Sequence, residues 1–554
     1  MLRRRVIPLV SLAVMALLAG VMTTSTRAQP ASPKAPTSQD VGKKLLDSPA
    51  ANFLTSPALA AVKMAASGNL NFSQQPARES EGAGPAALQR QIPPTAKKPS
   101  TFKNVQVNAA GADTNQLDQT TQSETAIAVA GSNVVVGFND SQRTLLVLTA
   151  GSSLSGYAFS SDRGTTWQDG GTIPNRPGDV NLGDPWLASD KAGNFYYSTL
   201  YISSRPNRFG LDIGVAKSTD GGRTFSAPVM ADTNATDLGF YLGDKDAIAA
   251  GVGAGGKGEA LYVAWDDFVF DPATFIFTSG LPVSRSTDGG GTWTVVYADR
   301  IPLSGPGCSF QQYIGAMPLV DTSGTVYLAA ERLFTENPNC VFPAPVKREI
   351  DSFVSKDGGQ TWSSRSVISA VTSSTPDGFA FVVGPGKVIR NLELPTLGFT
   401  KGTLYAAWND GAGGSSQVRV ASSKDGVSWT QSAAVTTGPE DHLQPAMTAD
   451  AQGVHILYYQ INGDDTLDVY ISNSPNGKNF SAGRVTTQSF PGVFTFPQFD
   501  PIIAFGYMGD YIAQATDGSR QYFAWGDNRN TIVNFLQPSG RNDPDVFYSS
   551  QTSE

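Results

Sequence analysis

Short runs of alternating apolar and polar residues fill most of the chain after about residue 100. Alternation with a period of two predicts β-strands that bury one face. Seven such segments share a pattern and lie at 126–140, 185–200, 259–267, 324–334, 402–410, 453–460 and 520–529. We predict that each belongs to the inner hairpin of one repeated unit, and that the fold is all-β.

Each of these segments except the last is followed by a copy of one octapeptide, Ser-x-Asp-x-Gly-x-Thr-Trp/Phe, called the box below. The copies are SSDRGTTW (160–167), STDGGRTF (218–225), STDGGGTW (286–293) and SKDGGQTW (355–362), with the shorter SKDGVSW (423–429) and SPNGKNF (474–480). The first five box aspartates are 58, 68, 69 and 68 residues apart. A nearly constant period indicates a repeat architecture.

The residues of the box are those of a tight turn. Its Ser and Asp side chains can accept backbone N–H bonds, and its Gly supplies a positive φ. We therefore predict a hairpin loop between the third and fourth strands of a unit. The box aspartates then have a structural role, and they are Asp162, Asp220, Asp288, Asp357 and Asp425.

Four strands per unit at a period of roughly 65 residues describe a β-propeller. The seventh unit has a third strand at 545–549 but no box and no fourth strand. Residues 102–107 (FKNVQV) alternate cleanly, and we predict that they supply the missing strand and close the ring. Seven blades over residues 101–554 is the predicted count, and six blades with an accessory hairpin is the alternative.

The N-terminal residues predict export. Three arginines precede an apolar run at 6–22, and Thr26-Arg27-Ala28 forms a small-x-small cleavage site, so residues 1–28 read as a signal peptide. Residues 29–100, rich in Pro, Ala, Ser and Gln, read as a linker or propeptide. Within them, 41–66 has the apolar spacing of a short helix or helix pair that docks on the main domain. The expected location is secreted or periplasmic.

The expected location bears on the oxidation state of the two cysteines. In an oxidising compartment Cys308 and Cys340 are expected to form a disulfide. Two buried free thiols are the alternative, because Cys packs well as a small apolar residue.

Composition and charge exclude several classes of partner. The 554 residues carry a formal net charge of −8, with only two His and two Cys. No basic footprint for nucleic acid is present, and no second apolar stretch is long enough to span a membrane. A zinc site built from His and Cys is not expected. We expect a monomer that requires no cofactor, with Ca²⁺ as a candidate ligand.

Carboxylates recur where each unit's first strand starts and its second strand ends. Both positions belong to one face of a propeller, around the central funnel. The first set is Glu124, Asp184, Asp244, Asp246, Glu393 and Asp510, and the second is Asp140, Asp266, Asp267, Asp410 and Asp527. Three interpretations stay open: caps of strand ends, a Ca²⁺ site, or paired carboxylates for glycoside chemistry.

Repeated boxes in an exported propeller resemble the Asp-box, or BNR, repeats of the sialidase (neuraminidase) superfamily, over about residues 102–554. The resemblance implies action on extracellular glycans and, if the protein is an enzyme, an exo-acting glycoside hydrolase. Such a site needs arginines around the sugar carboxylate, a Tyr nucleophile with a helper carboxylate, and an Asp as acid and base. The candidates are Arg143, Arg332, Arg390, Arg529, Asp184, Asp244, Glu393, Asp510 and Tyr511, with Tyr507 and Glu331 as alternatives for nucleophile and helper.

The alternative function is a non-catalytic propeller that binds a glycan, a cation or a protein. The absence of a Phe/Tyr-Arg-Ile-Pro motif ahead of the first box favours this alternative. The collection of Arg and carboxylates on one face favours the enzyme.

Overall fold

A computed structural model describes residues 37–48, 51, 54, 62–63, 65–67, 97–109, 121–140, 153–203, 209–233, 240–271, 276–341, 343–375, 380–384, 387–431, 433–494, 508–533, 538 and 540–553. The predicted signal peptide, Arg143 and Tyr507 lie outside these residues. Antiparallel strands dominate, so the fold class is all-β. The helical part comprises α1 (Ser38–Leu46), the short η5 (Ala254–Gly256) and helical residues at 62–63 and 65–67. None of the described helices has the length and apolarity to cross a bilayer.

Most described strands belong to seven antiparallel units of four strands, in which hairpins join neighbours along the chain. The first three units are β2 (Gln122–Ala130), β3 (Asn133–Asp140), β4 (Ser155–Ser160) and β5 (Gln168–Thr172); β6 (Val180–Ser189), β7 (Phe195–Ile202), β8 (Phe209–Ser218) and β9 (Val229–Met230); and β10 (Phe240–Val252), β11 (Glu259–Asp271), β12 (Ile276–Ser286) and β13 (Thr294–Pro302). The second and third units join into one sheet because β8 and β10 pair in parallel.

The next three units continue the pattern. They are β14 (Phe310–Val320), β15 (Val326–Thr335), β16 (Lys347–Ser355) and β17 (Ser366–Val371); β20 (Thr396–Thr400), β21 (Thr403–Asp410), β22 (Gln417–Ser423) and β23 (Trp429–Gln431); and β24 (Asp441–Ala449), β25 (Val454–Ile461), β26 (Thr466–Ser474) and β27 (Ser481–Arg484). The short β28 (Phe490–Pro491) also pairs with β26. A further sheet of β18 (Ala380–Val382), β19 (Lys387–Arg390) and β29 (Val493–Phe494) was not predicted from the sequence.

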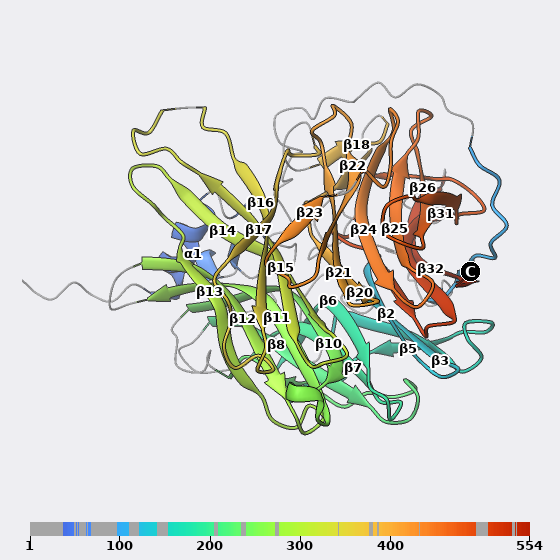
Figure 1. Cartoon of the computed structure of the whole chain (residues 1–554), viewed down its shortest axis with the longest axis horizontal. Helices are drawn as coiled ribbons and strands as arrows, with labels where there is room; N and C mark the ends of the chain where they lie inside the picture. The colour runs from blue at the N-terminus through green and yellow to red at the C-terminus, as the bar shows by residue number, and fades with distance from the viewer. Residues whose placement is uncertain are drawn as a thin grey trace, which may run out of the picture. The chain divides into compact units, whose positions relative to one another are not determined.

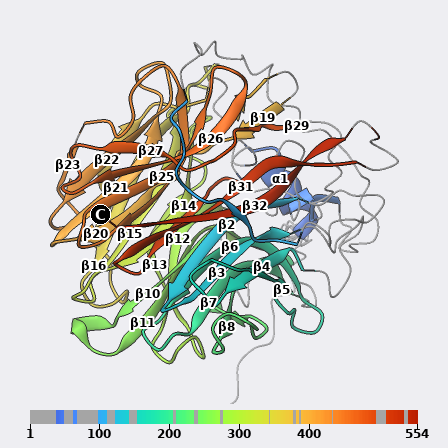
Figure 2. The same cartoon turned by 90° about the vertical axis from the view of Figure 1, so that its right-hand side faces the viewer.

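The seventh unit combines strands from both ends of the described chain. It consists of β30 (Ala513–Thr516), β31 (Arg520–Ile532), β32 (Arg541–Thr552) and β1 (Val105–Gln106). Strand β1 pairs antiparallel with β32, with Val105 opposite Tyr548. Figure 2 shows the blue segment that contains β1 beside the red β32. The strand expected over 102–107 is thus reduced to two residues, and Phe102 instead packs its ring edge-on to Phe523 at 6.1 Å.

The first strands of the units contact one another in chain order. Strand β2 contacts β6, β6 contacts β10, β10 contacts β14, β14 contacts β20, β20 contacts β24, β24 contacts β30, and β30 contacts β2. Figure 1 shows the same succession in colour, from the cyan and teal units through green and yellow to orange and red. Buried apolar side chains between neighbouring sheets form the cores, which include the fully buried Trp265, Trp408 and Trp525.

Each box forms the turn that its residues predict. In the third box, Asp288 Oδ1 accepts from Ser286 Oγ at 2.8 Å and from the Thr292 amide at 2.9 Å, while Gly290 N donates to Ser286 Oγ at 2.9 Å. The bond from the Thr292 hydroxyl to Asp288 Oδ2, at 2.7 Å, and then the bond from the Thr292 amide lower the pKa of Asp288 to about 2. The same pattern recurs at Asp162, Asp220 and Asp357, and in shortened form at Asp425.

Each box from the second onward also packs on the second strand of the unit before it. A Cβ on Gly222 would lie 2.1 Å from Val135 Cγ2, and one on Gly477 would lie 2.3 Å from Tyr405 Cε1, so these glycines allow contact that a side chain would block. The third, fourth and fifth boxes approach Tyr196, Tyr262 and Tyr327 in the same way.

Candidate functional site

The first strand of most units is interrupted by a β-bulge near its start. Register shifts occur in β2, β6, β10, β14 and β24. Four non-glycine residues at these bulges have positive φ: Glu124 (51°), Asp184 (52°), Lys245 (36°) and Gln444 (52°). Bulges redirect side chains, and strained backbone of this kind concentrates at special sites. The bulges that contain these four residues mark the candidate site.

Acidic side chains from separate units meet in one cluster beside these bulges. This carboxylate cluster comprises Glu124, Asp184, Asp244, Asp266 and Asp510, together with the cations Lys245 and Arg390. All five carboxylate residues are at most 1% exposed. The sequence singled out all five carboxylates, and the structure brings them together.

Backbone and side-chain donors hold the cluster in place. The Asp510 amide donates to Glu124 Oε1 at 3.0 Å, and the Gly315 amide donates to Asp266 Oδ1 at 2.9 Å. Arg390 Nε lies 3.2 Å from Asp510 Oδ1. Gln444 Nε2 donates to the carbonyls of Arg390 and Gly509, at 3.0 and 2.8 Å.

Burial and crowding favour the protonated forms in this cluster. Burial, and then the neighbouring Glu124, raise the pKa of Asp184 well above its usual range. Burial followed by the charge of Asp244 does the same for the pKa of Asp266. Burial also raises the pKa of Asp510 to about 7, although Arg390 acts in the opposite direction. The cluster therefore holds protons near neutral pH, as a general acid must.

Tyr511 occupies a structural position beside the cluster. Its hydroxyl donates to the Pro185 carbonyl at 3.0 Å, and the ammonium of Lys245 lies 3.8 Å from its ring centroid and 4.5 Å from that of Trp186. Burial, and then Glu124 and Asp184, raise the pKa of Tyr511 well above its ordinary value. A phenolate nucleophile is disfavoured in these surroundings.

Glu393 belongs to a second buried group. Arg348 Nη1 lies 2.6 Å from Glu331 Oε1 and also bonds Glu393 Oε2. Glu393 further accepts from the amide and the hydroxyl of Ser374, at 2.8 and 2.5 Å. Burial raises the pKa of Glu331 to about 7, while Arg348 opposes the shift. These carboxylates hold a buried arginine rather than face solvent.

The described arginine candidates each have their own partners. Arg332 pairs with Glu349 at 2.5 Å and with Asp351 at 3.4 Å. Arg529 pairs with Asp527 at 2.5 Å and lies over the ring of Phe547. Arg390 forms an ion pair with Asp510 and donates a hydrogen bond to the Leu54 carbonyl at 2.7 Å. Each of these three arginines thus has a carboxylate partner within the protein, and the clamp of several arginines on one anion stays a prediction.

The N-terminal segment packs over the rim of the cluster. Thr37 caps α1, which begins three residues before the predicted helical stretch, and Val41, Leu45 and Leu54 are at most 3% exposed. They share one apolar cluster with Leu182, Leu242 and Ile314, which lie at or just before the bulges of β6, β10 and β14, and with Leu392, which lies before β20. With Leu54 bonded to Arg390, this segment covers the carboxylate cluster.

Three polar residues of this region were missed in the sequence. Lys245 lies between Asp244 and Asp246, two residues that the sequence analysis singled out, so its position could have been noticed. Arg348 and Gln444 carry no motif, and only the pairing of distant strands reveals them. Within the described ranges, no three His, Cys, Asp or Glu residues are arranged as ligands of a metal ion.

Comparison with known proteins adds information about the fold. No protein-family model and no curated protein matches the chain. Similar solved structures include the α-L-arabinofuranosidase Arb93A of Fusarium graminearum, at 12% identity over 66% of this chain and 92% of that chain, with a TM-score of 0.40. The endosialidase of phage phi92 is 9% identical over 82% and 69% of the two chains, with a TM-score of 0.42. A leech intramolecular trans-sialidase is 11% identical over 66% and 68%, with a TM-score of 0.36.

The chain is thus similar in structure to sialidases and to an arabinofuranosidase. These identities and TM-scores are too low to carry an argument about substrate or activity. The chemistry of the chain is therefore argued from its own residues.

Proposed function

We propose that this chain is an exported seven-bladed propeller that binds extracellular glycans and does not hydrolyse sialosides. The seven four-stranded units are its blades, and β1 closes the ring. Support for the ring comes from the closed succession of contacts between first strands, in which β30 returns to β2, and from the pairing of β1 with β32.

The state of the arginines argues against sialoside hydrolysis. A sugar carboxylate needs guanidinium groups that are free to pair with it. Arg332, Arg390 and Arg529 are each engaged with a carboxylate of the protein. The pairing of these three arginines with carboxylates of the protein is the observation that supports glycan binding rather than sialoside hydrolysis.

Two further features agree with that choice. The hydroxyl of Tyr511 is committed to a backbone carbonyl, and the carboxylate cluster is buried beneath the N-terminal segment. A glycosidase needs an acid and a nucleophile that a substrate can reach. The buried pairs instead stabilise the centre of the fold.

The test combines an activity assay with a binding assay on the purified full chain. A fluorogenic sialoside and a fluorogenic arabinofuranoside are incubated with the protein, with and without Ca²⁺, beside Arg332→Ala and Arg390→Ala variants. We expect no turnover above the buffer rate and specific binding on a glycan array. Turnover that is lost in Arg390→Ala would overturn the proposal in favour of an enzyme, and an array without any binding would overturn the glycan assignment.

A further inference from the structure

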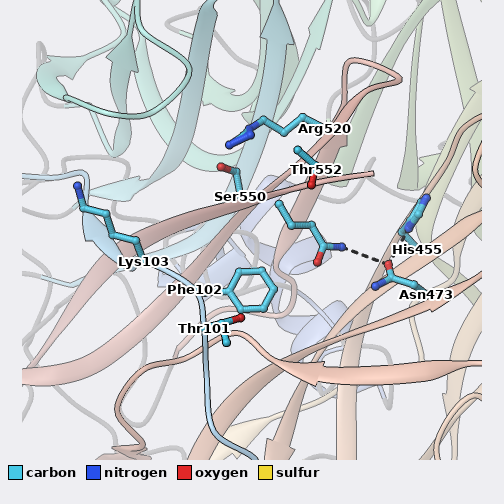
Figure 3. Close-up of a pocket in the computed structure, with 9 residues that line it drawn as sticks. Thr101, Phe102, Lys103, His455, Asn473, Arg520, Ser550 and Thr552 are labelled. Atoms are coloured by element: carbon cyan, nitrogen blue, oxygen red, sulfur yellow. Dashed lines mark hydrogen bonds between the residues drawn. The ribbon is translucent and has the colours of Figure 1, made fainter. Parts of the chain in front are cut away.

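A polar pocket of 420 Å³ opens at the end of the sixth and seventh units where the boxes lie. Its lining residues are Thr101, Phe102, Lys103, His455, Asn473, Arg520, Ser550, Gln551 and Thr552. They come from the segment before β1, the starts of β25 and β31, and the ends of β26 and β32 (Figure 3). We call it the Arg520 pocket.

The pocket lies where a seventh box would be. In the other six units a box joins the third strand to the fourth, but in the seventh unit these strands are β32 and β1, from opposite ends of the described chain. The residues that a box would connect are Ser550–Thr552 and Thr101–Lys103, and both stretches line the pocket.

His455 occupies the position on which that missing box would dock. Tyr327, Tyr405 and His455 are equivalent, because each pairs with the residue directly before the box serine of its own unit. Tyr327 and Tyr405 are covered by the box of the following unit, as are Val135, Tyr196 and Tyr262. No box in the described part of the chain covers His455, which lines the pocket instead, so a polar side chain occupies the docking position.

The floor of the pocket is held by a hydrogen-bond network. His455 Nδ1 lies 2.7 Å from Asn473 Oδ1, and its Nε2 lies 3.1 Å from Asp450 Oδ1. Gln551 Nε2 donates to Asn473 Oδ1 at 3.3 Å. Asp450 does not line the pocket, and its other oxygen accepts from Gln521 Nε2 at 2.6 Å. Figure 3 shows His455 and Asn473 on one side, with Phe102 and Thr101 below Ser550.

The charged groups of the lining are cations without acidic partners. Neither Lys103 nor Arg520 forms an ion pair with a described residue, and Arg520 Nε is buried without a hydrogen-bond partner there. The nearby Asp517 accepts from the Arg520 amide at 2.8 Å and from the Tyr522 hydroxyl at 2.7 Å rather than from the guanidinium. No Asp or Glu lines the pocket, in a chain whose net charge is −8.

We propose that the Arg520 pocket binds an oxyanion carried by a sugar, either a carboxylate or a sulfate ester. Arg520 and Lys103 neutralise the anion, because guanidinium and ammonium groups are its strongest protein donors. Ser550, Thr552 and Gln551 offer hydroxyl and amide groups to the sugar, and the Phe102 ring forms one wall. The choice of a sugar rests on the proposed function, whereas the oxyanion site rests on the pocket alone.

The test measures binding to the purified full chain by saturation-transfer NMR and calorimetry. The probes are sodium sulfate, glucuronic acid, N-acetylglucosamine 6-sulfate and, as neutral control, N-acetylglucosamine. We expect at least one of the two acidic sugars to bind with a Kd of about 1 mM or tighter, the neutral sugar not to bind, and sulfate to compete. The two acidic sugars distinguish a carboxylate ligand from a sulfate ester.

Three variants locate the site. Arg520→Gln and Lys103→Gln each weaken binding, by about tenfold for Arg520→Gln. Lys356→Gln removes the same charge from an exposed position in the fourth box and leaves binding unchanged. Thermal unfolding verifies that each variant is folded, and the exposed Lys103 provides a second arm if Arg520→Gln is unstable.

The outcomes distinguish the oxyanion site from the assignment of a sugar as the molecule that carries the oxyanion. Equal binding in wild type, Arg520→Gln and Lys103→Gln would overturn the site, as would the absence of binding by every anion at about 10 mM. Binding of sulfate without either sugar acid would overturn the sugar assignment alone. Failure on a glycan array, with anion binding retained at Arg520, would overturn the proposed function and keep the oxyanion site.

Discussion

The carboxylate cluster and the Arg520 pocket are both built where strands of neighbouring units begin and end, yet their charges are used in opposite ways. In the cluster, Arg390 forms an ion pair with Asp510 and donates a hydrogen bond to the carbonyl of Leu54, which belongs to the N-terminal segment. In the pocket, Arg520 and Lys103 have no described acidic partner and line an open space. In this chain, a collection of charged residues therefore indicates a binding site only where some charge is left unpaired.

The largest expected effect concerns the buried pair beside the cluster. Arg348→Ala leaves Glu331 and Glu393 buried without their cation, and we expect it to lower the free energy of unfolding by about 3–5 kcal/mol. Urea unfolding followed by tryptophan fluorescence measures the change. Arg365→Ala is the matched control, since Arg365 is 36% exposed, and it should cost about 0–1 kcal/mol. Similar losses in both variants would contradict the structural role of the buried pair.

The second effect concerns the segment that covers the cluster. Leu45 is fully buried in the apolar cluster that reaches the rim of the bulges, so Leu45→Ala should cost about 2–4 kcal/mol. Lys44→Ala, at an exposed position of α1, is the control and should be nearly neutral. Unfolding curves of the two variants measure the difference. If Leu45→Ala unfolds like the wild type, α1 is not part of the folded core.

The third effect is a dependence of stability on pH. The pKa of Asp510 is about 7 in the folded protein, against 3.8 without the fold, so the folded state binds more protons between these values. Stability from this group is full below the lower value and is lost as pH rises through the higher one. Raised pKa values of Asp184, Asp246 and Asp266 act with the same sign.

Asp510→Asn isolates this contribution. We expect the wild type to lose stability from pH 4 to 7, and the variant to lose about 3 kcal/mol less over the same range. Unfolding curves at several pH values provide the measurement, with Arg390, Glu124, Asp244 and Lys245 as the charges facing the group. A pH profile that the substitution leaves unchanged would show that Asp510 is ionised throughout.

The smallest effect concerns a turn remote from both regions. Asp357→Ala removes the bonds from the Thr361 amide and hydroxyl, and we expect a loss of about 1 kcal/mol. Calorimetric unfolding measures it, and the binding of acidic sugars should not change. A loss of sugar binding in this variant would place the ligand near the fourth box and break the comparison.

The repeat organisation was predictable because it is encoded locally. The boxes, the alternating strands and the carboxylates at strand starts each follow from short sequence patterns, and the structure forms the box turns as expected. The short β1 and the sheet of β18, β19 and β29 were not predicted at their observed extent. The pairing of β1 with β32 and that of β19 with β29 join residues more than a hundred positions apart, which no local pattern records.

The roles of the site residues were less predictable. Arg390 meets a backbone carbonyl 336 positions away in sequence, and its bond to Asp510 depends on a sheet absent from the sequence-based prediction. The Arg520 pocket had a sequence signal, the absence of a seventh box. The pocket itself could not be predicted from that signal, because only the strand register shows that His455 is equivalent to Tyr327 and Tyr405.

A crystal structure of the protein grown with glucuronic acid tests the comparison most directly. We expect electron density for the sugar in the Arg520 pocket, with its carboxylate beside Arg520 and Lys103, and an undisturbed contact between Arg390 and Leu54. A sugar carboxylate bound to Arg390, with the N-terminal segment displaced, would contradict it and would make the carboxylate cluster the functional site.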